Sequence, residues 1–290
     1  MSIRNLPAAP AGRPSAAVSS YISPRALERW DASVRAAVDD DEDRTISVYD
    51  VIGYDWWTGE GVTAKRIASA LRNMGAGDVT VNINSPGGDL FEGLAIYNLL
   101  REHQGHVTVK VLGVAASAAS VIGMAGDTVQ IARAGFFMVH NGWVIASGNR
   151  HDLRDIADWL EPFDQSMADI YVARTGQDLA AVQKQMDGET WIGGSSAVDQ
   201  GYADELLPSD QVGKSEGKAS ANAVRRVEAA IRAAGLPRSE AQRLIHEFKS
   251  SLSDSAGGGA RDATGRGPSD SAALSTTAAL AASLTTILRG

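Results

Sequence analysis

Between positions 45 and 207, stretches of alternating hydrophobic and polar residues are interleaved with stretches of helical periodicity. Alternation is typical of half-buried strands, and apolar residues three or four positions apart are typical of helices. The predicted strands span 46–52, 79–83, 107–112, 128–131 and 136–139, and the predicted helices span 61–74, 90–103 and 117–124. This β-α-β-α order predicts an α/β domain built on parallel strands.

A longer helical pattern follows at 152–174. The apolar stripe of this amphipathic helix consists of Ile156, Leu160, Phe163, Met167, Ile170 and Tyr171. A shorter helix is predicted over 179–186, and a helical turn over 195–201 completes the domain near Leu207.

The chain before this domain has a different composition. Residues 1–44 begin with a stretch rich in Ala, Pro and Ser, which predicts a flexible N-terminal arm. Within it, a short helix is predicted from Ser23, with Leu27, Trp30 and Val34 on one face.

The chain after the domain, 208–290, is predicted to form a separate tail. Helical patterns at 223–234 and 239–252 are followed by a stretch at 253–271 that is rich in Gly, Ser and Asp and predicts disorder.

The composition limits the partners and the catalytic groups that the chain can have. The chain has 290 residues, no cysteine and a formal net charge of −8. The acidic balance argues against nucleic acid as a partner, and the lack of thiols excludes thiolate nucleophiles, disulfides and cysteine-based metal centres. A nucleophile must therefore be Ser, Thr, Lys or a carboxylate. Residues 1–20 do not resemble a signal peptide, and no apolar run is long enough to span a membrane, so we expect a cytoplasmic protein. We also expect no metal and no cofactor.

Three segments join a strand to a helix or turn and carry residues suited to catalysis. The Asn-Ser-Pro-Gly-Gly segment at 84–88 can turn sharply and point amide groups outward. Ser117 lies among small residues at the start of a predicted helix, where the helix dipole is positive. His140 ends an apolar strand, and ligand crevices of α/β domains open at strand ends.

Each feature alone has an ordinary explanation: a tight turn, a helix N-cap and a structural hydrogen-bonding histidine. Together they offer a nucleophile at Ser117, a base at His140 and oxyanion-binding amides near Gly88, which are the requirements of acyl transfer. Asp187 and Glu189 are both candidates for the carboxylate that orients the histidine.

Four of the motifs, taken in order, resemble the proteolytic subunit of the Clp protease (ClpP) over 45–207. They are Ile-Asn-Ser-Pro-Gly-Gly at 83–88, Gly-x-Ala-Ala-Ser at 113–117, the strand ending in His140, and 197–204. The resemblance implies a ClpP/crotonase-like α/β fold of repeated β-β-α units, in which the helix at 152–174 is a protruding handle.

The resemblance also implies roles for individual residues. It makes Ser117 the nucleophile and His140 the general base, with the amides of Gly88 and Ala118 as the oxyanion hole. The third member in the family is an Asp, and counting back from Gly201 places Glu189 there, with Asp187 as the other candidate.

The segment 52–62 resembles the phage branch of this family, the head maturation or prohead proteases. That branch implies a serine endopeptidase that cleaves capsid or scaffold proteins, forms a ring-shaped homo-oligomer, and works in the host bacterial cytoplasm or inside the procapsid. By the same analogy the tail at 208–290 is a scaffold-like extension, and a dispensable tail is the other interpretation. The first 45 residues do not resemble the axial loop that docks an ATPase, so dependence on an ATPase partner stays open.

Three alternatives keep part of this picture. The first is a ClpP-like assembly or scaffolding protein with weak catalysis, favoured by the altered third carboxylate. The second is an acyl-CoA enzyme of the crotonase type. The third is a Ser–Lys peptidase, against which Lys110 is predicted to lie within a strand.

Overall fold

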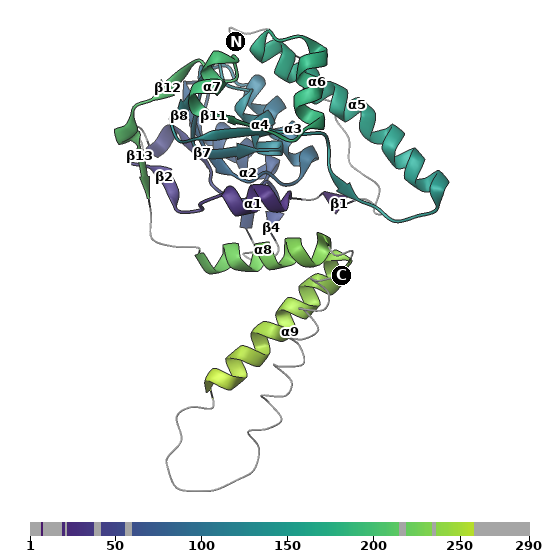
Figure 1. Ribbon diagram of the computed structural model, residues 1–290. Helices are drawn as coiled ribbons and strands as arrows, with labels where there is room; N and C mark the ends of the chain where they lie inside the picture. The colour runs from purple at the N-terminus through teal and green to yellow at the C-terminus, as the bar shows by residue number, and fades with distance from the viewer. Residues whose placement is uncertain are drawn as a thin grey trace, which may run out of the picture. The chain divides into compact units, whose positions relative to one another are not determined.

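The computed structural model describes residues 7, 19–20, 22–37, 42–55, 60–214, 219–233 and 236–257. The chain divides into two compact units between Ala219 and Ser220. The first unit contains the predicted domain at 45–207 together with described parts of the N-terminal segment (Figure 1).

A seven-stranded sheet forms the centre of the first unit. Its strands are β3 (Thr45–Val48), β6 (Val79–Ser85), β7 (Val107–Ala116), β8 (Thr128–Ala132), β9 (Phe136–Val139), β11 (Thr190–Gly193) and β12 (Glu205–Leu207). The strand order is β11-β9-β7-β6-β3, with β8 paired to β7 and β12 paired to β8. Every pairing in this sheet is parallel except β9 with β11, so the predicted α/β class is confirmed.

The longest strand, β7, changes its partner along its length. Residues 108–111 pair with β8, and residues 114–116 pair with β9. Because β7 and β9 are parallel and adjacent at their carboxyl ends, the residues that follow them meet at one edge of the sheet.

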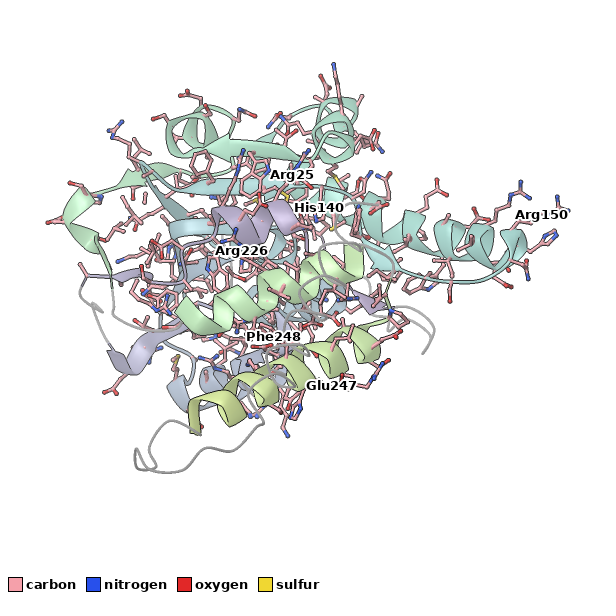
Figure 2. All side chains as sticks on the ribbon, turned by 60° about the horizontal axis from the view of Figure 1, so that its bottom comes forward. Arg25, His140, Arg150, Arg226, Glu247 and Phe248 are labelled. Atoms are coloured by element: carbon pink, nitrogen blue, oxygen red, sulfur yellow. The ribbon has the colours of Figure 1, made fainter. Side chains whose placement is uncertain are left out.

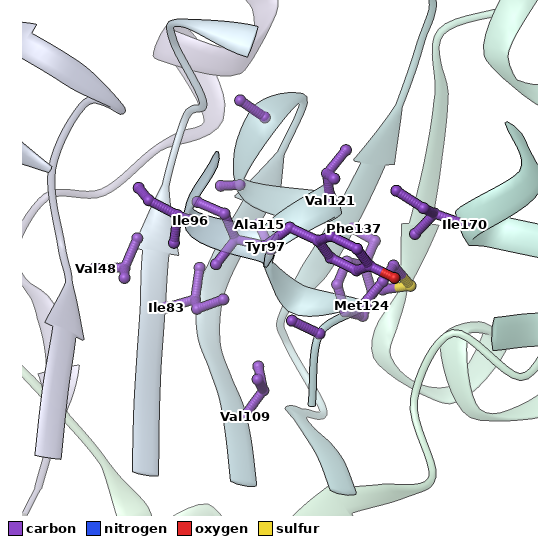
Figure 3. Packing of buried hydrophobic residues seen from close by; sticks show 14 of the residues in the cluster. Val48, Ile83, Ile96, Tyr97, Val109, Ala115, Val121, Met124, Phe137 and Ile170 are labelled. Atoms are coloured by element: carbon purple, nitrogen blue, oxygen red, sulfur yellow. The ribbon is translucent and has the colours of Figure 1, made fainter. Parts of the chain in front are cut away.

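Helices complete the domain. They are α2 (Ala64–Met74), α3 (Leu90–Arg101), α4 (Ala118–Gly123), α5 (Arg150–Thr175), α6 (Leu179–Asp187) and α7 (Gly194–Asp199). Fully buried side chains from strands and helices, including Ile83, Tyr97, Val109, Val121 and Phe137, pack into one core (Figure 3). This dry packing makes the sheet a rigid base for groups at its edge.

The predicted amphipathic helix at 152–174 is α5, which has a capping box at Asn149 and is capped at its carboxyl end by Gly176. Its buried residues start only at Phe163. The half before Phe163 extends away from the sheet, so α5 protrudes as the predicted handle helix does (Figure 1).

The described part of the N-terminal segment packs on the domain. It contains β1 (Ser19–Ser20), which pairs with β10 (Val144–Ile145), then α1 (Pro24–Arg29), and β2 (Val34–Ala36), which pairs with β13 (Val212–Lys214). The indole of Trp30 donates to the carbonyl oxygen of Asn84 at 3.0 Å, and the Asn84 amide donates to the carbonyl oxygen of Asp31 at 2.7 Å.

Some element bounds differ from the pattern. The helix predicted to place Val34 beside Leu27 ends at Arg29, because the Asp31 carboxylate accepts from the backbone of Ser33 and turns the chain. The predicted strand at 46–52 ends at Val48. The helix predicted from 61 begins at Ala64, where the Thr63 side chain caps it and the preceding residues form the β4–β5 hairpin (Gly53–Asp55 and Glu60–Val62).

The described part of the second unit is helical. Its helices are α8 (Ala219–Ala233) and α9 (Arg238–Gly257). The helix predicted at 223–234 lies in α8 except for its last residue, and the helix predicted at 239–252 lies within α9. The first five residues of the stretch predicted to be disordered continue α9, and 258–271 lie outside the described residues. No helix in the described ranges is long and apolar enough to cross a membrane.

Candidate active site

Ser117 and His140 meet at the edge where β7 and β9 end. Ser117 follows the last residue of β7, His140 follows the last residue of β9, and Ala116 is paired with Met138 across the two strands. The imidazole Nε2 of His140 lies 2.6 Å from Ser117 Oγ, a hydrogen bond between the two predicted catalytic side chains. A nucleophile and a base within this distance form the core of a serine hydrolase site.

The backbone of Ser117 has a conformation that non-glycine residues rarely adopt, with φ of 54° and ψ of −125°. Such strain costs about 1–3 kcal/mol and persists only where neighbours fix the backbone. The Ser117 amide donates to the carbonyl oxygen of Met138 at 2.9 Å, and the Ser120 amide donates to the Ser117 carbonyl at 2.9 Å. Ser117 occupies the N-cap position of α4, yet its side chain makes no cap hydrogen bond. Its hydroxyl is instead directed to His140.

The environment of His140 favours the neutral imidazole. The residue is 7% exposed, and burial lowers the pKa of His140 below its ordinary value of 6.5, while the charge of Glu189 acts in the opposite direction. The net lowering leaves the ring neutral at pH 7. A neutral Nε2 can accept the proton of Ser117, which a general base must do.

The two candidate carboxylates have different surroundings. Glu189, at a φ of 45°, precedes β11, which pairs with β9 so that Thr190 lies opposite Val139. Its charge acts on His140, whereas the Asp187 carboxylate accepts from the Asn141 amide at 2.8 Å on the surface. Glu189 is therefore the carboxylate that acts on the histidine.

The contacts of Glu189 are made by the N-terminal segment. Its Oε2 accepts from Ser23 Oγ at 3.3 Å, and its Oε1 lies 3.7 Å from an Arg25 guanidinium nitrogen. Among the described residues, neither Glu189 nor Asp187 is hydrogen-bonded to the His140 ring. The site thus contains a hydrogen-bonded Ser117–His140 pair and a nearby carboxylate, Glu189, that acts on the imidazole through its charge.

The predicted oxyanion turn lies directly against the nucleophile. A Cβ at Gly87 would stand 2.7 Å from Ser117 Cβ and 2.6 Å from the carbonyl oxygen of Ala116, so only glycine permits this approach. Gly88, with φ of 150°, packs as closely on the backbone of Ile52. Ala118 is the first residue of α4, where an amide has no acceptor within the helix. The two turns that carry the predicted oxyanion amides therefore flank Ser117.

Four functional neighbours were missed by sequence reasoning. Ser120 and Tyr171 support the Ser117 carbonyl, with Ser120 Oγ 2.6 Å from that oxygen and 2.8 Å from the Tyr171 hydroxyl. Ser23 and Arg25 approach Glu189 from α1. Tyr171 belongs to the predicted apolar stripe of 152–174, where a hydroxyl among aliphatic residues was the available signal. The described residues hold no cluster of three or more His, Asp or Glu suited to a metal.

These features define an α/β protein with a Ser–His pair at the carboxyl edge of a mostly parallel sheet. The chain belongs to the Clp protease family, whose family model matches residues 43–210. The match covers the predicted domain, so the expected ClpP-like fold and handle helix are confirmed. It also argues against the crotonase-type alternative.

Curated relatives agree with this assignment. The chain is 30% identical over 161 residues to the ATP-dependent Clp protease proteolytic subunit 3 of Rhodococcus jostii (strain RHA1), covering 52% of this chain and 79% of that protein. It is 28% identical over 151 residues to proteolytic subunit 2 of Thermobifida fusca (strain YX), covering 50% and 74%. Among solved structures, a ClpP1 mutant from Listeria monocytogenes matches with a TM-score of 0.49 at 20% identity, over 58% of this chain and 93% of that chain.

Proposed function

We propose that the protein is a serine endopeptidase of the ClpP type with Ser117 as nucleophile and His140 as general base. The observation that carries the proposal is the 2.6 Å hydrogen bond between them, formed by a serine held at a φ of 54°. Strained serines at a strand-to-helix turn are typical of nucleophiles, because the turn exposes the hydroxyl to a substrate.

The proposed reaction proceeds in two halves. Ser117 Oγ bonds to the scissile carbonyl carbon while its proton passes to His140 Nε2, and the amides of Gly88 and Ala118 hold the oxyanion. His140 then gives the proton to the leaving amine as the peptide bond breaks. Water, deprotonated by His140, hydrolyses the acyl-enzyme in the second half. The negative charge of Glu189 stabilises the imidazolium that forms in each half.

We further propose that the enzyme acts in phage head maturation. Its substrates would be capsid or scaffold proteins, and it would act in the host cytoplasm or in the procapsid. The resemblance of 52–62 to that branch and the helical tail after 208 support it. The family and the protruding α5 support a ring-shaped homo-oligomer that stacks through this helix.

A second candidate function is a ClpP-like assembly protein with weak catalysis. The specific observation in its favour is that Ser23 and Arg25, rather than His140, contact the Glu189 carboxylate. An unbonded imidazole is less well oriented, and loss of the orienting acid lowers turnover by about 10⁴ in serine proteases.

A labelling experiment separates the two candidates. The full chain is treated with a fluorophosphonate probe and with fluorescein-labelled casein, beside Ser117→Ala and His140→Ala. An endopeptidase labels at Ser117 and cleaves casein, and both activities are lost in each variant. Full casein cleavage by Ser117→Ala would exclude the proposed nucleophile, and absence of labelling in the unmodified chain would favour the assembly protein.

A further inference from the structure

The N-terminal segment pairs as a strand with β10 and contacts Glu189 beside the candidate active site. In β1, Ser20 pairs antiparallel with Val144 and Ser19 with Ile145. The strand to which β1 is added, β10, begins four positions after His140 in the chain. An extended segment on a strand edge beside a protease site is the geometry of peptide recognition by strand addition.

The same segment makes a second contact three residues after β1. Ser20 is paired with β10, and Ser23 Oγ donates to Glu189, which precedes β11. Three residues span at most about 10 Å, so the β10 edge and the Glu189 carboxylate, which are the partners of Ser20 and Ser23, lie near each other.

The segment is anchored at this second contact and just after it. Ser23 is 7% exposed, and Ala26 of α1 is packed among Val114, Ala116 and Met138, which lie in the carboxyl-terminal parts of β7 and β9. Arg25 of α1, labelled with His140 in Figure 2, has a guanidinium nitrogen 3.7 Å from Glu189 Oε1. Because α1 is fixed on the strands that Ser117 and His140 directly follow, the residues just before α1 are held near the site.

We propose that β1 together with Ile22 and Ser23, here called the strap, occupies the place of a substrate strand on β10 and competes with peptide substrates. The inference rests on the proposed function, since it names the segment that the peptide-binding edge holds before a substrate arrives. A substrate must displace the strap from β10, while α1 stays in place. Activity is then set by how readily the backbone of Ser19 and Ser20 leaves β10.

The test weakens the strap without touching the catalytic residues. In the full chain, Ser19→Pro/Ser20→Pro removes both backbone donors of β1, and Ser15→Pro, which lies ahead of β1 in sequence, is the matched control. A tethered strand has an effective concentration of ~1 mM, so a strap with a dissociation constant of ~0.1 mM slows cleavage about tenfold. We expect casein cleavage to rise by about this factor in the double variant and to stay unchanged in the control.

A binding measurement makes the outcome independent of catalysis. In the Ser117→Ala background, a fluorescein-labelled peptide with the sequence of 17–23 is titrated while its anisotropy is recorded. The peptide should bind the double-proline chain about tenfold more tightly than the Ser15→Pro chain. Equal binding by the two chains would overturn the strap. If binding follows the prediction but no variant cleaves casein or labels at Ser117, the strap stands and the proposed function fails.

Discussion

The hydroxyl of Ser120 lies 2.6 Å from the carbonyl oxygen of Ser117, and it receives a hydrogen bond in turn from Tyr171 at 2.8 Å. Ser120 gives its one hydroxyl proton to the Ser117 carbonyl, so Tyr171 is the donor in the second hydrogen bond. Burial also raises the pKa of Tyr171 well above its ordinary value, so the phenol keeps its proton. The handle helix α5 thereby supports the strained turn of the nucleophile through one intermediate side chain.

Removing this support should reduce both stability and turnover. Ser120→Ala leaves the buried Tyr171 hydroxyl without its partner, so we expect a loss of about 1–3 kcal/mol in the free energy of unfolding. Tyr171→Phe leaves Ser120 free to donate to Ser117 and should cost only about 1 kcal/mol. Urea unfolding measures both values. A positioning role further predicts that kcat of Ser120→Ala falls while KM stays unchanged, and a parallel change in both would contradict it.

The pH dependence of cleavage should report His140. Its pKa is lowered by burial, and only the neutral ring accepts the Ser117 proton. We therefore expect kcat/KM to rise with pH through a single acid limb centred below pH 6.5 and to reach a plateau at higher pH. Rates measured from pH 4.5 to 8 test this, and an acid limb centred above pH 7 would show that the ring is not desolvated.

The same pKa predicts how stability changes with pH. Between the lowered folded pKa and the unfolded value near 6.5, the unfolded chain binds more protons at His140 than the folded chain does. The contribution of His140 to stability is therefore fully present above pH 6.5 and is lost as pH falls through the folded pKa. Replacing His140 by Gln should flatten this part of the stability profile, as measured by urea unfolding at pH 5 and pH 7.

Substitutions should distinguish the roles of the two carboxylates, Glu189 and Asp187. The charge of Glu189 raises the pKa of His140 against the effect of burial, so Glu189→Gln should move the acid limb to lower pH and reduce kcat. Asp187→Asn should leave the limb in place, because Asp187 contacts Asn141 instead. A limb that moves in Asp187→Asn and not in Glu189→Gln would reverse the assignment of the two acids.

The sequence predicted the parts of this site that follow from local patterns, and it missed the contacts between residues far apart in the chain. Ser117 and His140 each end a strand whose hydrophobic pattern is local, and adjacent parallel strands bring such ends together. The positive φ of Glu189 and its contact with Ser23, 166 positions away, have no local signal. The pattern likewise predicted a short helix near Ser23 but not the turn at Asp31, where the carboxylate accepts hydrogen bonds from the backbone amide and the hydroxyl of Ser33.

Two glycines with a positive φ, Gly87 and Gly75, allow the effect of close packing to be separated from the effect of backbone strain. Gly87→Ala places a methyl group 2.7 Å from Ser117 Cβ, so the oxyanion turn must move away from the nucleophile. We expect kcat to fall by about 10²–10³, the usual effect of losing an oxyanion donor. Gly75→Ala is the matched control, because Gly75 also has a positive φ, 68°, but nothing lies within 4 Å of the added carbon. It should lose about 1 kcal/mol of stability and no activity. Equal activity in the two variants, measured at equal folded fraction, would show that the turn does not serve the reaction.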